Sequence, residues 1–562
     1  MKTTGAEAVI KSLIAEEVTT IFGYPGGAIM PIYDALYDYK DQLNHILVRH
    51  EQGAIHAAQG FARTSRRTGV CFATSGPGAT NLLTGLADAM IDSTAVVCIT
   101  GQVTSGLLGT DAFQETDVIG ISMPVTKWNI QVTQAEDIPA ALSKAFYIAN
   151  SGRPGPVLVD ITKDAQFGEL DFNYEKCTSI RSYVAQPITD VTVIEQAVEL
   201  LNSAKKPYLL IGQGIILSRA EKELVEFAEK TGIPVASTLL GLGAFPTDHP
   251  QYVGYLGMHG NYAPNIKTNQ CDVLLAIGMR FDDRVTGDTS RYAKQARVIH
   301  VDIDKSELNK IVDTEVAIHG DAKTVLNSLI KHVDQRTHVS WLEEFRESEA
   351  LEQREVIDRE ITPMAKSPLK MAEVVHLLSE KTKGEAVIVT DVGQHQMIAS
   401  RYYRFKHTTS NVTSGGLGTM GFGLPAAIGA KLGAPKRQVI AIMGDGGFQM
   451  TIQELGTILQ SGVDVKLLIL NNNFLGMVRQ WQQLFFDRRY SFTDIQNPNF
   501  ITIAKGYDIP GKMIDKRADL SAALDELLCH KGSFLLEVTV EKEENVFPMI
   551  ATGSSVSEIR LS

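Results

Sequence analysis

Short, nearly continuous apolar runs alternate with helix-like stretches along the whole chain. Apolar runs of strand length are typical of parallel strands that helices cover on both faces. The alternation therefore predicts α/β domains built on doubly wound parallel sheets. The predicted strands are residues 46–49, 70–74, 95–100, 157–161, 208–211, 273–277, 298–301, 386–389, 439–442, 466–470 and 534–538.

Two segments interrupt this alternation. Residues 167–190 are polar and irregular, and residues 337–370 carry a dense charge run followed by Pro363 and Pro368. We predict that the charge run is a solvated helix, with a partner-binding segment as the alternative. Gly-rich turns directly after strands make the first and last thirds of the chain look alike. The expected organisation is three domains at residues 1–165, 190–335 and 370–540, with linkers at 166–189 and 336–369 and a tail at 541–562.

Composition excludes several classes of protein. Hydrophobic residues make up 44% of the 562 residues, which is too many for a disordered chain, and the net charge of -12 disfavours a surface that coats nucleic acid. The longest apolar runs are too short to span a bilayer, so no membrane association is expected. The five cysteines show no C-x-x-C spacing and the first residues lack the apolar core of a signal peptide. These features predict a cytoplasmic protein without a zinc site or a disulfide framework.

Many of the 47 glycines stand directly after predicted strands. One Gly-rich turn needs no ligand to explain it, because tight turns require positive φ. Several such turns favour ligand sites, because open parallel sheets bind ligands beyond the carboxyl ends of their strands. The turns are GYPGG at 23–27, SGPGATN at 75–81, ITGQ at 99–102, IGQG at 211–214, IGMRFDD at 277–283, SGGLGTMGFGLPAA at 414–427 and MGDGGF at 443–448.

The most specific pattern covers residues 444–472. Asp445 follows one predicted strand, a helix that is expected to stop at Gly462 comes next, and a second strand runs into Asn472. This β–α–β unit brings Asp445 and Asn472 to neighbouring strand ends. A carboxylate, an amide oxygen and a backbone carbonyl suit Mg²⁺, which keeps phosphate oxygens among its other ligands. The neighbouring glycines let backbone N–H groups face the phosphates.

These motifs resemble those of a known family. GDG, then 24 residues, then NN resembles the signature of thiamine-diphosphate enzymes. The chain is similar over essentially its whole length to the catalytic (large) subunits of acetolactate synthase, also called acetohydroxyacid synthase. The resemblance implies a pyrimidine-binding domain, a central FAD-binding domain and a diphosphate-binding domain, in that order. Its motifs, in chain order, are RHEQGA, SGPGATN, ITGQV, GTDAFQE, GRPGPVLVDITKD, LGMHG, RFDDR, DVGQHQM, TSGGLGTMGFGLPAA and GMVRQW.

The resemblance also implies a reaction, its cofactors and its partners. The family decarboxylates pyruvate with thiamine diphosphate and Mg²⁺. It transfers the two-carbon unit to a second pyruvate, giving 2-acetolactate, or to 2-oxobutyrate, giving 2-aceto-2-hydroxybutyrate. This is the first common step of branched-chain amino acid biosynthesis, and FAD is structural because the reaction has no net redox step. A homodimer or a dimer of dimers and a small regulatory subunit are implied as well.

The family pattern assigns cofactor residues by position. Glu51 is expected to hydrogen-bond N1′ of the thiamine aminopyrimidine held by a partner subunit, and Asp445, Asn472 and the Phe474 carbonyl are expected to bind the metal. Phe474 stands where the family often has His, and only its carbonyl is needed. The other expected thiamine diphosphate contacts are Gly76, Asn81, Gln114, Gln394, His395, Gly418, Met420, Gly446, Gly447, Gly476 and Met477.

Substrate residues follow in the same way. Arg284 is expected to bind the carboxylate of the second oxoacid, with an ion pair to Asp282 or Asp283 as its alternative role. Trp481 is expected to favour the additional methylene of 2-oxobutyrate. The other residues expected around the substrate are Phe113, Gln114, Lys163, Met477 and Val478.

FAD contacts are expected mainly in the central domain. IGQG departs from the family's usual three glycines at Gln213, and Thr104, at the rim of the substrate channel, stands where many relatives have Pro, so inhibitor sensitivity is not assumed. The expected FAD contacts are Arg153, Gly212, Gln213, Gly214, Thr238, Leu239, Leu256, Gly257, Met258, His259, Gly278, Met279, Arg280, Phe281, Asp282, Asp302, Ile303, Asp321, Ala322, Gly415 and Gly416.

Three rival functions remain at this point. One is another thiamine enzyme, such as pyruvate oxidase, a 2-oxoacid decarboxylase or glyoxylate carboligase, which RFDDR and GMVRQW disfavour. Another is an FAD-free catabolic acetolactate synthase, which the FAD motifs disfavour. The third is a non-enzymatic binding protein that keeps the fold, which intact Glu51, Asp445 and Asn472 disfavour.

Overall fold

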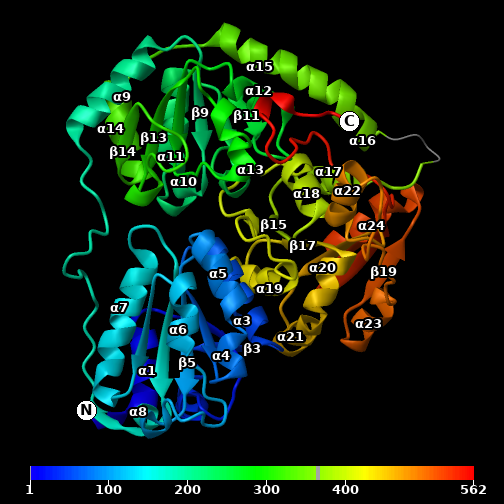
Figure 1. Cartoon of the computed structure of the whole chain (residues 1–562). Helices are drawn as coiled ribbons and strands as arrows, with labels where there is room; N and C mark the ends of the chain where they lie inside the picture. Colours follow the sequence, from blue (N-terminus) through cyan, green and yellow to red (C-terminus); the bar gives the residue numbers. More distant parts are fainter. Residues whose placement is uncertain (1, 363–366) are drawn as a thin grey trace.

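The computed structural model describes residues 2–362 and 367–562, so Pro363 of the predicted second linker lies outside the described residues. Within these residues the strands form three six-stranded sheets, each entirely parallel, and one two-stranded antiparallel pair. Helices cover each large sheet, so the predicted doubly wound α/β architecture is confirmed (Figure 1). None of the described helices is both long enough and apolar enough to cross a membrane.

The first unit is built from a sheet whose inner strands are buried along their whole length. Helices α1 (Gly5–Ala15) and α7 (Ile138–Asn150) pack on one face, and α3 (Glu51–Ser65) and α5 (Leu83–Ile91) pack on the other. The short pair β1 (Lys2–Thr4) and β8 (Glu169–Asp171) closes the unit. In spatial order the strands are β3 (Asn44–Leu47), β2 (Thr20–Gly23), β4 (Gly69–Ala73), β5 (Val96–Gln102), β7 (Pro156–Thr162) and β6 (Trp128–Val132).

The third unit repeats the strand order of the first: second, first, third, fourth, sixth, fifth. The predicted likeness of the two units therefore extends to their topology. Its strands are β16 (Asn411–Thr413), β15 (Val387–Thr390), β17 (Val439–Gly444), β18 (Lys466–Asn471), β20 (Phe534–Thr539) and β19 (Gly511–Ile514). Its helices are α17 (Met371–Thr382), α18 (Gln394–Tyr402), α19 (Gly423–Gly433), α20 (Asp445–Met450), α21 (Leu455–Ser461), α22 (Gly476–Phe485), α23 (Phe500–Gly506) and α24 (Arg517–Cys529).

The central unit has the strand order third, second, first, fourth, fifth, sixth, which reverses between β9 and β12. Ligands of open α/β sheets bind in the crevice at such a reversal. The strands are β11 (Tyr252–Tyr255), β10 (Val235–Ser237), β9 (Pro207–Ile211), β12 (Val273–Ile277), β13 (Arg297–Asp302) and β14 (Val316–His319). The helices are α9 (Val191–Ser203), α10 (Gln213–Leu217), α11 (Glu221–Thr231), α12 (Tyr262–Thr268), α13 (Asp283–Thr286) and α14 (Ala322–His332).

The predicted charge run begins as α15 (Val339–Glu352), which lies across the central unit (Figure 1). Most of its charged residues reach solvent, but Trp341 and Phe345 are buried in the core of the central unit, and Trp341 Nε1 donates to the Pro207 carbonyl at 2.8 Å. Val556, near the C-terminus, joins the same core. Both α15, from the predicted second linker, and the C-terminal tail therefore pack on the central unit. The predicted domain and linker limits stay a prediction.

The first and third units meet where α3 crosses α19. Gly60 and Gly429 allow this contact, because a Cβ on Gly60 would overlap the Ala426 carbonyl and a Cβ on Gly429 would overlap the Ala57 carbonyl. The backbones of α3 and α19 are therefore in direct contact, and this contact fixes the relative orientation of the first and third units. This contact places the loop that precedes α19 against α5 of the first unit (Figure 1).

Candidate active site

A cavity of about 1290 Å³ lies at the carboxyl ends of β9, β12, β15, β17 and β18, between the central and third units. Residues at the end of α7, including Arg153, and residues 185–186 of the first predicted linker complete its wall. Pockets for single small molecules are usually about 300–1,000 Å³. The cavity is therefore large enough for more than one ligand.

The third unit supplies one end of the cavity. The register of β17 and β18 pairs Gly444 with Leu470, so Asp445 and Asn472 follow at adjacent strand ends. Both side chains are buried, with 1% and 3% of their surface exposed. All the thiamine diphosphate residues predicted in the third unit line this end: Gln394, His395, Gly418, Met420, Asp445, Gly446, Gly447, Asn472, Gly476 and Met477.

Asp445 has the surroundings of a carboxylate that receives a cation. Burial raises its pKa to about 6, although a hydrogen bond from Asn497 Nδ2 at 2.7 Å opposes the increase. Asn497 was not predicted, and its only signal in the sequence is an Asn in an irregular segment. The same Nδ2 lies 3.0 Å from both Asn471 Oδ1 and Asn473 Oδ1, so one amide holds the two strand ends together.

The donor set fits Mg²⁺. Within residues 2–362 and 367–562, no three His, Cys, Asp or Glu side chains gather as a metal-binding group. The predicted set needs only one carboxylate, from Asp445, together with the Asn472 amide oxygen and the Phe474 carbonyl, and all three residues line the cavity. A hard cation that takes phosphate and water oxygens as its remaining ligands suits such a set.

A buried amide network fixes this end of the cavity. Gln394 Nε2 donates to Gln480 Oε1 at 2.9 Å, and Asn472 Nδ2 donates to Gln394 Oε1 at 3.3 Å. Gln480 is fully buried and also accepts the backbone N–H of Val546 at 2.8 Å, which ties the C-terminal tail to α22. A Cβ on Gly476 would overlap Gln394 Oε1. The GMVRQW motif contains Gln480, but sequence reasoning singled out only Trp481.

The central unit supplies the other end. Gly214 lies directly against Gly278, with no room for a side chain on either residue, so the turns after β9 and β12 meet at the strand-order reversal. His259 is buried, burial lowers its pKa to about 3, and its Nδ1 has no hydrogen-bond partner among the described residues. A tight glycine turn and an unpartnered ring nitrogen in one cavity wall fit a bound dinucleotide.

Most of the residues predicted to contact FAD share this wall. Phe281 does not line it, because its ring packs in the core against Tyr292 and His300, and Gly212 lies behind Gly278. The residues that line the cavity are Arg153, Gln213, Gly214, Thr238, Leu239, Leu256, Gly257, Met258, His259, Gly278, Met279, Arg280, Asp282, Asp302, Ile303, Asp321, Ala322, Gly415 and Gly416.

Arg284, from the central unit, and Val478 and Trp481, from α22 of the third unit, line the same cavity. The Arg284 side chain is 59% exposed, and its guanidinium lies 3.7 Å from Asp283 and 3.7 Å from the Met258 sulfur. A loose, exposed ion pair leaves the guanidinium able to receive a second carboxylate. Trp481 stands on α22 and its ring lies 5.0 Å from that of Phe485.

Apart from Arg153, the site residues predicted in the first unit do not line this cavity. Glu51 begins α3 and accepts a hydrogen bond from Asn81 Nδ2 at 2.9 Å. Gln114 adopts a left-handed φ of 59°, which is uncommon for a residue with a side chain, and its backbone packs against Gly76. Phe113 beside it is 88% exposed. The predicted thiamine and substrate residues of one chain thus fall into two groups, and only one of them lines the cavity.

Lys163 and Thr104 lie near this second group. Lys163 begins α8 (Lys163–Phe167) at the end of β7, and Thr104 caps a short 3₁₀ turn (Ser105–Leu107) after β5. Asp164 joins the two segments by accepting the Ser105 backbone N–H at 2.9 Å. Neither residue lines the large cavity.

Three family models match the chain. They describe the N-terminal TPP-binding domain, the central domain and the C-terminal TPP-binding domain of thiamine pyrophosphate enzymes, and they match residues 3–121, 194–329 and 391–538. Each match falls on one of the three parallel sheets.

Curated proteins match over nearly the full length. The chain is 46% identical over 556 residues to the acetolactate synthase isozyme 2 large subunit of Escherichia coli (strain K12), with 99% of each protein covered. It is 45% identical over 568 residues to the acetolactate synthase large subunit of Corynebacterium glutamicum, covering 99% of this chain and 90% of that protein. It is 44% identical over 564 residues to the probable acetolactate synthase large subunit of Methanocaldococcus jannaschii, covering 99% and 95%.

Proposed function

Because the chain belongs to the thiamine pyrophosphate enzymes and, within them, to the large subunits of acetolactate synthase, we propose that it joins two 2-oxoacids in branched-chain amino acid biosynthesis. One pyruvate loses CO₂, and its two-carbon unit is transferred to the carbonyl of a second pyruvate or of 2-oxobutyrate. The observation that supports this most strongly is the burial of Asp445 and Asn472 side by side in a cavity that also contains Arg284 and Trp481.

Bound thiamine diphosphate supplies the carbon nucleophile and stabilises negative charge beside the cleaved carboxylate. Asp445, Asn472 and the Phe474 carbonyl would hold Mg²⁺ at the diphosphate. Gly446 and Gly447, at the start of α20, would bring backbone N–H groups to the phosphates without a side chain in the way. Met420 would support the thiazolium ring from below.

Glu51 would hold a proton at N1′ of the aminopyrimidine. It stands at the first residue of α3, and its second oxygen is already oriented by Asn81. A carboxyl group fixed in this way can share its proton without reorienting, as general acid–base catalysis requires.

Arg284 and Trp481 would receive the second oxoacid. The guanidinium would pair with the acceptor carboxylate, and the indole would contact its alkyl group. Discrimination of one methylene in an apolar pocket is worth about 1–3 kcal/mol, which is enough to favour 2-oxobutyrate over pyruvate.

A homodimer is the smallest complete unit in this proposal. Glu51, Asn81 and Gln114 do not line the cavity that holds Asp445, and Phe113, next to Gln114 in the chain, is exposed. A second copy would bring its own Glu51, Asn81 and Gln114 to the mouth of this cavity. The same contact would cover the exposed Phe113 side chain. FAD would occupy the central end of the cavity. The relatives are large subunits, which supports a small-subunit partner.

A product assay tests the proposal. The purified chain is given pyruvate alone and pyruvate with 2-oxobutyrate, while thiamine diphosphate, Mg²⁺ and FAD are omitted in turn. The proposal expects 2-acetolactate and 2-aceto-2-hydroxybutyrate. Acetaldehyde or acetyl phosphate as the main product would favour a decarboxylase or an oxidase, and a protein purified without flavin that is fully active would favour an FAD-free enzyme.

A further inference from the structure

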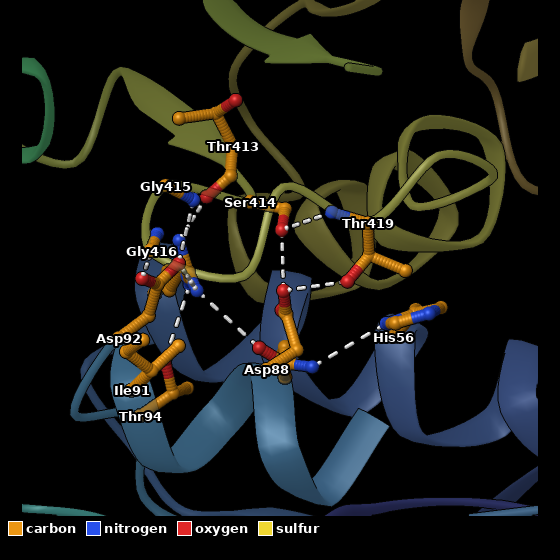
Figure 2. Close-up of polar contacts among 12 residues, drawn as sticks. His56, Asp88, Ile91, Asp92, Thr94, Thr413, Ser414, Gly415, Gly416 and Thr419 are labelled. Atoms are coloured by element: carbon orange, nitrogen blue, oxygen red, sulfur yellow. Dashed lines mark hydrogen bonds and ion pairs between the residues drawn. The ribbon is translucent and has the colours of Figure 1, made fainter. Parts of the chain in front are cut away.

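A buried pair of carboxylates lies behind the cavity wall, at the junction of the first and third units. Asp88 and Asp92 stand one turn apart at the end of α5, and the loop of residues 414–419 passes directly above them (Figure 2). Both residues are almost completely buried, with exposed fractions of 0% and 1%. A negative charge at a helix C-terminus is disfavoured, so these acids need a role outside α5.

Asp92 binds the loop with both oxygens. Its Oδ2 accepts the backbone N–H of Gly415 at 2.8 Å, and its Oδ1 accepts that of Gly416 at 2.7 Å. Arg63 from α3 balances the charge, with its guanidinium 2.9 Å from Oδ2. The same Arg63 donates to the Thr413 carbonyl, so one ion pair holds the loop at two neighbouring points.

Asp88 uses only one oxygen. Its Oδ1 accepts the hydroxyls of Ser414 and Thr419, the latter at 3.0 Å, whereas Oδ2 has no hydrogen-bond partner among the described residues. An amide in place of this carboxylate would keep the oxygen that accepts both hydroxyls. Replacing the carboxylate by a carboxamide would therefore remove a hydrogen bond at Asp92 but could keep both hydrogen bonds at Asp88.

Asp92 itself does not line the cavity, but Gly415 and Gly416, whose N–H groups it binds, do. Its chain neighbours Ile91 and Ser93 and its loop partners Gly415 and Gly416 all form part of the wall. A Cβ on Gly415 would lie 2.8 Å from Leu240 Cγ, and a Cβ on Gly416 would lie 2.8 Å from Ile91 Cγ1. Gly415–Gly416 thus packs closely between the central and first units, and Asp92 accepts hydrogen bonds from both of its N–H groups.

We infer that Asp92 is a positioning residue for flavin binding: by holding the N–H groups of Gly415 and Gly416, it fixes from the first unit the part of the wall that faces the FAD end of the cavity. The inference rests on the proposed function in that FAD occupies this end. Asp88, on the same helix, serves as the matched control because its contacts survive the same substitution.

The test compares Asp92→Asn with Asp88→Asn in the full-length chain. Flavin is removed, and FAD is titrated back while the quenching of its fluorescence is measured; thiamine diphosphate binding is measured in parallel by calorimetry. In Asp92→Asn the N–H group of Gly415 or Gly416 meets an amide NH₂ instead of an oxygen. The Kd for FAD is expected to rise about tenfold or more, because a hydrogen bond to a charged group contributes this much. The Kd for thiamine diphosphate is expected to change about threefold at most, and Asp88→Asn is expected to change the FAD Kd about twofold at most.

Equal losses in the two variants, or an equal loss of both cofactors in Asp92→Asn, would overturn the inference, because each points to general damage. If Asp92→Asn fails to fold, Asp92→Glu moves the same carboxylate by one methylene relative to the Gly415 and Gly416 N–H groups and must weaken FAD binding in the same selective way. A wild-type chain that does not bind FAD would contradict the flavin part of the proposed function and the inference with it. A wild-type chain that binds FAD with an unchanged Asp92→Asn variant would contradict the inference alone.

Discussion

At the scale of single residues, the proposed choice of oxoacid depends on one side chain of α22. Trp481 lines the cavity beside Val478, whereas Phe485, one turn further on, contacts the indole from outside the wall. The indole is a large apolar surface in the wall of the cavity that Arg284 also lines. Replacing it should therefore change the product, because the rest of the site is left intact.

Trp481→Leu is expected to lower the ratio of 2-aceto-2-hydroxybutyrate to 2-acetolactate by about tenfold, because the pocket loses contact with the additional methylene. The measurement is a competition with equal concentrations of pyruvate and 2-oxobutyrate, followed by chromatography of the products. Phe485→Leu is the control and should leave the ratio nearly unchanged. An unchanged ratio in Trp481→Leu would remove this residue from the acceptor pocket.

The sequence indicated Asp445 and Asn472 because their spacing follows from the geometry of a β–α–β unit, and the structure brings them together. Asp92 and Asn497 could not be found in this way. Their roles depend on contacts with segments hundreds or tens of positions away, at Gly415 and Asp445, and no local pattern records such contacts. The catalytic roles of Glu51, Arg284 and Trp481 stay predictions.

At the scale of elements, strands were predictable where both faces are buried. All of the eleven predicted segments overlap observed strands, because inner strands such as β18 are continuously apolar. Five of the six edge strands of the large sheets were missed, namely β6, β11, β14, β16 and β19, since they are partly exposed and carry mixed side chains. The short inner strands β2 and β10 were missed as well, although they are buried. The stop at Gly462 is confirmed: it ends α21 with a left-handed φ of 67°.

Gly60→Ala tests the α3–α19 junction. A Cβ there would meet the Ala426 carbonyl, and overpacking against backbone should destabilise the fold by about 3 kcal/mol or more. The expected result is a lower thermal midpoint with earlier loss of activity. Gly506→Ala is the control, because a Cβ at Gly506 meets no atom within 4 Å. Equal midpoints for the two variants would show that the two helices do not pack this closely.

A buried acid at the same junction predicts a pH dependence. Glu454 accepts the Arg49 backbone N–H at 3.1 Å and the Thr457 hydroxyl at 2.6 Å, and burial raises its pKa from 4.5 to about 7. The folded state therefore favours the protonated form. The stability that Glu454 contributes is complete below pH 4.5 and is lost as the pH rises to about 7, and the full effect is at most about 3 kcal/mol.

Glu454→Gln should consequently reduce the fall in thermal midpoint between pH 5 and pH 8. Midpoints measured across this range for the wild type and the variant give the comparison, with Glu195→Gln on the exposed face of α9 as the control for removing a carboxylate. A variant with the same pH slope as the wild type would show that Glu454 ionises as freely as a surface residue.

At the scale of the whole molecule, the predicted site residues of one chain fall into two groups. The cavity contains Asp445, whereas Glu51 belongs to the group around Asn81 and Gln114 on the first unit. The first and third units pack closely through α3 and α19, so a large rearrangement of these two units within one chain would break a tight backbone contact. In the proposed homodimer, a second copy would complete the site without such a change.

Complementation between inactive variants tests this arrangement. Glu51→Gln and Asp445→Asn are each expected to lose nearly all activity. When the two chains are produced together, mixed dimers contain one site with both native residues, so activity should return to about a quarter of the wild-type value. Mixtures of differently tagged Glu51→Gln chains serve as the control and stay inactive. No recovery in confirmed mixed dimers would place both residues in one chain's own site.

The most direct test of the central claim is the identity of the product made from pyruvate by the purified chain. With thiamine diphosphate, Mg²⁺ and FAD present, nuclear magnetic resonance of the reaction mixture should show 2-acetolactate and CO₂ in equal amounts. Production should stop when thiamine diphosphate is omitted and in Asp445→Asn. Acetaldehyde, acetate or acetyl phosphate in place of 2-acetolactate, or turnover that does not depend on thiamine diphosphate, would contradict the account.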